Sequence, residues 1–314
     1  MNILLPVDGP LDVSATLSRY RLWGEDPANR FAGDVFRRVL RHDGRLIPYE
    51  VRWSGGVDDT RLDLRLRPVG RRHLSASAVD AALMVAGAEV RHVFGLAFDL
   101  PGFYRMAKSD PVLADVVPAL YGLRPTLTAN PLEMLVGSIT AQQVNLTFAF
   151  ALRARIVRRY GTPVILDGET LYAFPEAATL AAARLPTLRR MQFSAGKARY
   201  IQGVARAIAR GTLDPTTLAT ATNADVIERL TALRGLGRWT ADWFMARCLG
   251  RGDVCPAGDL AVRKAFDHYY GRRRALSEEA IRRRARAWGP YQNLAIHYLL
   301  AGMRRARPAT GGGT

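Results

Sequence analysis

Nine residues in the C-terminal half of the chain decide the fold, and they read Leu233-Arg234-Gly235-Leu236-Gly237-Arg238-Trp239-Thr240-Ala241. Gly235 and Gly237 flank one apolar residue, which predicts a tight turn between two helices with uncovered backbone N–H groups. Uncovered amides beside a helix N-terminus form an anion site. A Gly-x-Gly between helices is also often only a C-cap and a turn. The apolar underside given by Leu233 and Leu236 favours the helix-hairpin-helix interpretation.

A lone carboxylate follows this hairpin at Asp259, eighteen residues after Ala241. Taken alone, Asp259 has an ordinary explanation, because Asp is a preferred N-cap residue and Pro256-Ala257-Gly258 is a suitable loop into a helix.

The charge of the chain predicts a polyanionic partner. Its 314 residues carry a formal net charge of +17, and the 45 basic residues include only three lysines, at Lys108, Lys197 and Lys264. Such a surplus predicts salt-sensitive binding to nucleic acid, although arginine richness also reflects genomic base composition. The arginine runs 272–274 and 282–284 are candidates for DNA contact or for plain solvation.

Cysteine content and hydropathy exclude several other classes. Two cysteines, Cys248 and Cys255, are too few for an iron–sulfur cluster, and without a CxxC pair a structural zinc site is not expected. The sequence contains no run of about 18 apolar residues, so no membrane span is expected. The first residues lack a basic region followed by a long apolar core, so no secretory signal is expected. The sequence therefore predicts a cytoplasmic, nucleoid-associated protein without a metal site.

Residues 1–95 have the pattern of an α+β domain with an antiparallel sheet. Arg61–Arg67 alternates strictly, as a strand with one buried face does. Val35–Leu40 and Ile47–Trp53 flank His42-Asp43-Gly44, which is a hairpin signal. Helices are expected at 11–23 and 76–88.

Residues 96–306 have a helical pattern, and 307–314 form a Gly-rich tail. Asn130-Pro131-Leu132-Glu133 combines a capping Asn, Pro at the first helical position and Glu at the third. Many short helices with short loops predict a helical domain of two lobes. Further helices are expected to begin near Glu169, Pro175, Ala195, Leu213, Asn223, Thr240, Asp259, Ser277 and Tyr291.

The hairpin and three further segments together resemble the bacterial 3-methyladenine-DNA glycosylase II enzymes of the helix-hairpin-helix (HhH-GPD) superfamily. These segments are Ile139–Asn145, Ser194–Ile201 and Trp288–Tyr291. The resemblance runs from about Phe98 to Leu300, and the sheet domain in front fits the same subfamily. It implies an α+β protein, with an N-terminal antiparallel-sheet domain followed by a two-lobed all-α glycosylase domain.

The resemblance also implies an activity, namely hydrolysis of the N-glycosidic bond of alkylated purines such as 3-methyladenine and 7-methylguanine. Asp259 matches the catalytic Asp of the family. Trp239 and Trp243 match positions that line the aromatic base pocket; they are four residues apart and share a helix face. Their other interpretation is an ordinary core stripe. The resemblance adds Gln142 to the base pocket and places Gln143 where the best-known members have a leucine wedge.

Several positions depart from the family or extend its implications. Strand-cutting relatives carry a nucleophilic lysine where this chain has Trp239, so a glycosylase without lyase activity is expected. Leu260 and Leu300 replace aromatics of some members, which shifts the expected substrate range. The hairpin residues expected to bind DNA are Leu233, Arg234, Gly235, Leu236, Gly237, Arg238 and Thr240. No cofactor is expected beyond a possible alkali ion at the hairpin backbone.

Two alternatives stay open beside this expectation. One is a glycosylase of the same superfamily for another damaged base, such as an oxidised purine. The other is a non-catalytic DNA-binding protein that kept the hairpin and lost the chemistry. Asp259 argues against the second, because the one residue the reaction requires is present. The partner in each case is double-stranded DNA, and members of this fold usually act as monomers.

Overall fold

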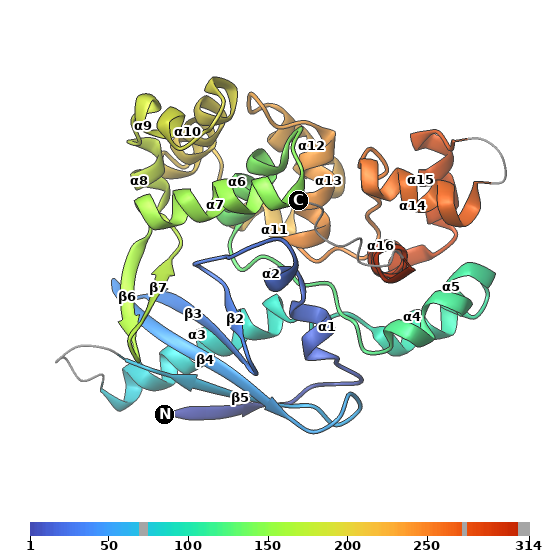
Figure 1. The fold of residues 1–314 in the computed structure, drawn as a ribbon, viewed down its shortest axis with the longest axis horizontal. Coiled ribbons are helices and arrows are strands. Elements are labelled where there is room, and N and C mark those ends of the chain that lie inside the picture. The colour runs from blue at the N-terminus through green and yellow to red at the C-terminus, as the bar shows by residue number, and fades with distance from the viewer. Residues whose placement is uncertain (69–74, 272–274, 307–314) are drawn as a thin grey trace, which may run out of the picture.

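The computed structural model describes residues 1–68, 75–271 and 275–306. Its N-terminal part is an antiparallel sheet with strand order β1-β5-β4-β3-β2, covered on one face by α3 (Ala76–Val93) (Figure 1). The strands are β1 (Asn2–Leu5), β2 (Arg30–Ala32), β3 (Val35–His42), β4 (Arg45–Ser54) and β5 (Arg61–Leu66). The antiparallel sheet is the one that the alternating pattern predicts, and β1 and β2 extend it at its two edges.

Local sequence explains how these elements begin and turn. Asp43 and Gly44 both have positive φ, 48° and 68°, as a two-residue hairpin turn requires. The helix expected at 11–23 is broken at Ser18 into α1 (Val13–Leu17) and α2 (Arg19–Leu22). α3 extends five residues beyond the expected end.

One predicted helix is wrong. The residues from Glu169 form a strand, β7 (Glu169–Ala173), which pairs with β6 (Thr162–Leu166) in a two-stranded sheet. The turn between them is Asp167-Gly168, again with positive φ at both residues, 51° and 79°. Asp-Gly between alternating residues is a strong hairpin signal. The signal was therefore present in the sequence and favours the strands over a helix.

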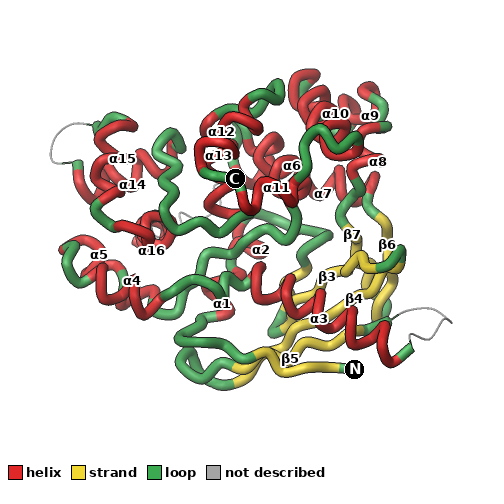
Figure 2. Tube along the Cα trace, turned by 180° about the vertical axis from the view of Figure 1, so that it is seen from behind, coloured by secondary structure: helices red, strands yellow, loops and turns green. Residues whose placement is uncertain are grey.

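The remaining chain is helical and gathers into two groups. Figures 1 and 2 show α6–α13 together above the sheet, and α14–α16 beside α4 and α5. This is the two-lobed arrangement that the sequence predicts. The helices are α4 (Leu100–Ala107), α5 (Pro111–Val116), α6 (Pro131–Ala141), α7 (Leu146–Tyr160), α8 (Ala177–Ala181), α9 (Leu185–Arg190), α10 (Ala195–Ala209), α11 (Pro215–Thr220), α12 (Asn223–Thr231), α13 (Arg238–Arg247), α14 (Leu260–Tyr270), α15 (Glu278–Arg286) and α16 (Gln292–Ala306), with 3-10 turns at Pro118–Leu120 and Gly289–Tyr291.

A buried ionic network joins the sheet to the helices. Glu133 on α6 accepts from Arg153 on α7 at 2.7 Å and pairs with Arg38 of β3 at 3.3 Å. Arg153 also donates to Asp26 at 2.9 Å. Burial alone would raise the pKa of Glu133, but the charges of Arg38 and Arg153 override it and lower this pKa to about 2. Glu133 thus serves the network, while Asn130 caps α6 through the Glu133 N–H.

No helix of the described residues is long and apolar enough to cross a membrane.

Candidate active site

The predicted helix-hairpin-helix is confirmed by the backbone. α12 ends at Thr231, Leu236 N donates to the Leu233 carbonyl at 3.1 Å, and α13 begins at Arg238. The second helix thus begins two residues earlier than predicted. Gly237 is the N-cap of α13 and is exposed, and no side chain caps this end. The first N–H groups of α13 are left for an external acceptor.

The two hairpin glycines have different reasons to be glycine. Gly235 has φ +92°, and a Cβ on it would lie 2.1 Å from the Tyr200 ring. Gly237 has φ −120°, and a Cβ there would meet nothing within 4 Å. The Gln142 side-chain amide donates to the Gly235 carbonyl at 2.8 Å. The turn is therefore fixed on one side by packing against Tyr200 and by the hydrogen bond from Gln142. On the other side, Gly237 leaves the backbone exposed.

Asp259 is both a helix cap and an acceptor for side chains of the hairpin. One carboxylate oxygen accepts from the Ala261 and Val262 amides at 2.8 and 3.1 Å. The other accepts from the indole Nε1 of Trp239 at 2.8 Å and of Trp243 at 3.1 Å. Four N–H donors thus stabilise a negative charge on a partly exposed side chain. The N-cap interpretation of Asp259 is therefore confirmed, and its catalytic role stays a prediction.

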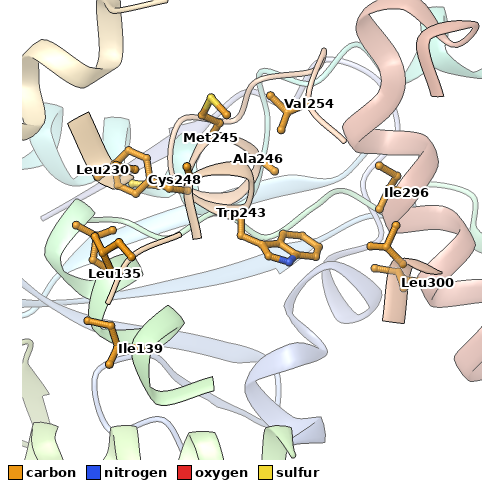
Figure 3. Packing of buried hydrophobic residues seen from close by; sticks show 14 of the residues in the cluster. Leu135, Ile139, Leu230, Trp243, Met245, Ala246, Cys248, Val254, Ile296 and Leu300 are labelled. Atoms are coloured by element: carbon orange, nitrogen blue, oxygen red, sulfur yellow. The ribbon is translucent and has the colours of Figure 1, made fainter. Parts of the chain in front are cut away.

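The tryptophans combine a core role with a role at the carboxylate. Trp239 is partly exposed, whereas Trp243 is 9% exposed and belongs to the buried cluster that also contains Ile296 and Leu300 of α16 (Figure 3). Trp243 is therefore part of the core, as the core-stripe interpretation predicts, and it also donates a hydrogen bond to Asp259. The sequence placed both residues on one helix face but gave no sign that their N–H groups converge on Asp259.

A neutral histidine lies behind Trp243. The His297 ring meets the Trp243 ring edge to face, with centroids 5.9 Å apart. Its Nδ1 faces the Asn293 carbonyl at 2.9 Å and its Nε2 faces Arg247 Nη1 at 3.3 Å. Burial, with the charge of Arg247, lowers the pKa of His297 to about 3. The sequence did not indicate this neighbour.

The other predicted site residues divide into exposed and buried ones. Gln143 follows the C-cap of α6, is exposed and has φ +55°, and its role as a wedge residue stays a prediction. Arg234 and Arg238 are exposed on the hairpin. Thr240 is 1% exposed, so its side chain packs inward, and its place in the DNA-binding hairpin stays a prediction.

The replaced aromatic positions and the lysines also have defined places. Leu260 is 64% exposed beside Asp259, whereas Leu300 is 9% exposed in the core. Lys197 Nζ donates to the Thr140 carbonyl at 2.9 Å, and partial burial lowers its pKa. Lys264 is exposed on α14. The Gly235 carbonyl is taken by Gln142, and an alkali ion at the hairpin backbone stays a prediction.

Comparison with known proteins places these features in a family. Residues 136–290 match the HhH-GPD superfamily of base excision DNA repair proteins. A DNA-3-methyladenine glycosylase of Bacillus subtilis is 30% identical over 206 residues, which are 66% of this chain and 68% of that protein. Residues 136–290, which match the family, contain Gln142, the hairpin and Asp259.

Solved structures share the fold over nearly the full length. A 3-methyladenine DNA-glycosylase of Archaeoglobus fulgidus superposes with a TM-score of 0.83 at 24% identity, covering 96% of this chain and 98% of that one. An 8-oxoguanine glycosylase/lyase of Clostridium acetobutylicum, solved with double-stranded DNA, gives a TM-score of 0.73 at 17% identity over 98% of each chain. The chain belongs to the HhH-GPD superfamily of base excision repair proteins and is a DNA glycosylase.

Proposed function

We propose that this glycosylase hydrolyses the N-glycosidic bond of alkylated purines in duplex DNA, and that it does so without cutting the strand. The observation that carries the proposal is the Asp259 carboxylate, held by the indole N–H groups of Trp239 and Trp243 beside the hairpin. The similarity to a DNA-3-methyladenine glycosylase supports the same substrate class.

The chemistry follows from where charge develops. The bond between C1′ and the base nitrogen breaks with its electron pair going to the base, so positive charge grows on the sugar. The fixed Asp259 carboxylate stabilises that charge. Water then forms a bond to C1′ and passes a proton to Asp259, from which the proton returns to solvent or the leaving base.

The indole rings suit this substrate class. A target base must leave the stack to reach Asp259. An N-alkylated purine carries a positive charge, and the face of Trp239 attracts such a ring by stacking and cation–π interaction. Alkylation also weakens the glycosidic bond, so the proposed substrate range is broad. Gln142 and Gln143, near the end of α6, are proposed to border the gap left in the DNA.

Absence of lyase activity rests on the identity of residue 239. A lyase needs an amine that attacks C1′ and forms a Schiff base. The N–H of Trp239 is instead a hydrogen-bond donor to Asp259. The proposed enzyme is a monomer acting on nucleoid DNA, with no cofactor.

A second candidate is a glycosylase for a different damaged base. Leu260, which replaces an aromatic of some relatives, is 64% exposed beside Asp259. A less aromatic pocket wall weakens stacking on a cationic base. An oxidised or deaminated purine is then the alternative substrate.

The test is base release from duplex DNA methylated at purine ring nitrogens, with released bases identified by mass. We expect 3-methyladenine and 7-methylguanine from the wild type. Asp259→Asn keeps an N-cap residue and the shape of the side chain but removes its charge, so it should fold and release neither base. Borohydride should trap no enzyme–DNA adduct. Release of another base, equal activity of Asp259→Asn, or a trapped adduct would each reject the corresponding part of the proposal.

A further inference from the structure

Arg282 on α15 links the two parts of the active site. Its Nη2 donates to Asp242 Oδ2 at 2.8 Å, and its Nη1 donates to the Cys255 carbonyl at 2.8 Å. Asp242 lies on α13 between Trp239 and Trp243 in the sequence. Cys255 stands four residues before Asp259 in the loop that leads into α14. One guanidinium therefore joins the helix that carries the tryptophans to the loop that carries the carboxylate.

The other end of this linkage is at the hairpin. Asp242 is 1% exposed, and its second oxygen accepts from Arg238 Nε at 2.8 Å. The Arg238 side chain is 53% exposed at the first position of α13, next to Gly237. Arg238, Asp242, Cys255 and Arg282 line a recess of about 280 Å³. The network thus runs from the proposed DNA-binding turn to the Asp259 loop.

The three arginines of the run 282–284 have different environments. Arg283 is exposed. The Arg284 guanidinium lies 3.7 Å from the centre of the Tyr270 ring and 3.5 Å from Asp110. Arg282 alone of the three is paired with Asp242. Arg282 is 25% exposed and paired with a buried carboxylate, so solvation alone does not describe it, and DNA contact of the run stays a prediction.

α15 touches the Asp259 loop at a second point. A Cβ on Gly258 would lie 3.2 Å from the Glu278 carboxylate, so the start of α15 packs closely against the residue before Asp259. Two contacts from one helix restrict the movement of the loop relative to α13.

We propose that Arg282 is a positioning residue for base excision, which holds Asp259 at hydrogen-bond distance from the two indole N–H groups. The effect on rate rests on the proposed function, whereas the effect on the tryptophans does not. A displacement of the carboxylate by about 1 Å costs on the order of 100-fold in rate when groups must be aligned for reaction. Removal of Arg282 leaves Asp242 paired with Arg238, so the buried carboxylate keeps a partner and the fold should persist.

The experiment compares Arg282→Met with Arg283→Met, which removes the same charge one residue along the same helix. Single-turnover base release and DNA affinity are measured separately at one salt concentration. We expect Arg282→Met to lower the single-turnover rate about 10- to 100-fold, with DNA affinity within about twofold of Arg283→Met. Arg283→Met should keep the wild-type rate. Arg282→Lys, which can reach one acceptor but not both, should recover part of the rate.

A second readout does not need activity. Arg282→Met should change the fluorescence emission of Trp239 and Trp243 and its quenching by acrylamide. The change should be absent when Arg282→Met is made in the double variant Trp239→Phe/Trp243→Phe. Arg283→Met should show no such change. If Arg282→Met does not fold, Arg282→Lys serves in the same comparison because it keeps a cation opposite Asp242.

The outcomes separate this inference from the proposed function. Wild-type protein that releases no methylated base contradicts the function, and the fluorescence comparison still decides the role of Arg282. An equal loss of DNA affinity in Arg282→Met and Arg283→Met with unchanged rate would make Arg282 a DNA contact and overturn the inference. Unchanged rate together with unchanged tryptophan emission would also overturn it.

Discussion

Asp259 accepts hydrogen bonds from two different helices. Its Oδ1 caps α14, while its Oδ2 receives the two indole N–H groups. The cap fixes the carboxylate at the start of the helix, and the tryptophans fix its orientation. In the proposed reaction, a carboxylate fixed in this way does not have to reorganise when positive charge develops on the sugar.

The sequence predicted the members of this site but not their bonds. The resemblance of the hairpin to the family identified Asp259, Trp239 and Trp243, because they match family positions in and after the hairpin. The indole donors could not be foreseen, because a helix face defines a direction and not a side-chain rotamer. Tyr200 and Arg282 were missed for a related reason, since each acts through a contact with a residue far away in the chain. Tyr200 does lie in the quoted segment Ser194–Ile201, which was the available signal.

His297 gives a prediction for stability against pH. Its pKa is lowered to about 3 by burial and by Arg247, with Arg304 and Arg19 adding to the effect, whereas in the unfolded chain it is about 6.5. Below pH 6.5 the unfolded chain binds a proton that the folded protein does not, so stability is complete above pH 6.5 and decreases as the pH falls. The contribution is at most about 1.4 kcal/mol per pH unit.

Urea unfolding at pH 7.5 and pH 5.0 tests this. Wild-type protein should lose about 1–2 kcal/mol more than His297→Gln over this interval. His92, whose pKa burial also lowers, is present in both proteins and cancels. An equal loss in both proteins would contradict a buried neutral His297.

At the scale of elements, the hairpin glycines form a matched pair. Gly235→Ala introduces a Cβ 2.1 Å from the Tyr200 ring at φ +92°. We expect this change to destabilise the protein by about 1–3 kcal/mol through strain and overpacking. Gly237→Ala meets no neighbour and should keep the melting temperature. Its Cβ lies on the open side of the turn, so it should weaken DNA binding.

Melting curves and DNA titrations distinguish the two effects. Loss of stability in Gly237→Ala, or wild-type stability in Gly235→Ala, would mean that the turn differs from the one described. Each variant adds one methyl group to the same turn, at positions only two residues apart. Each is therefore the control for the other.

Elements were predicted best where periodicity and caps agree. The strands at 35–42 and 61–66 and the helix capped by Asn130 follow directly from alternation and capping. The β6–β7 hairpin was missed because it interrupts a long helical region, although Asp167-Gly168 has the same chemistry as Asp43-Gly44. The break at Ser18 has no comparable local signal.

At the scale of the molecule, the network around Glu133 connects the sheet to the helical lobes. Sequence predicted Glu133 as a helix-start residue, and its long-range partners Arg38 and Arg153 could not be read from local pattern. Glu133→Gln leaves two buried guanidinium groups without their shared carboxylate. We expect a loss of about 3–5 kcal/mol in the free energy of unfolding.

Denaturant unfolding provides the measurement, and Glu176→Gln is the control. Glu176 pairs with Arg41 at 3.2 Å, but its side chain is 55% exposed, so its removal should cost about 1 kcal/mol or less. Similar small losses in both variants would show that the network contributes little to the connection between sheet and helices.

The two buried cysteines have a consequence for the survival of the protein under the conditions in which such an enzyme would be needed. Burial raises the pKa of both Cys248 and Cys255 to about 12. At neutral pH both thiols are therefore protonated. Electrophiles that methylate purine nitrogens also attack thiolates, which are the reactive form of cysteine. With both thiols protonated and buried, the enzyme would resist the methylating reagents that produce its proposed substrate.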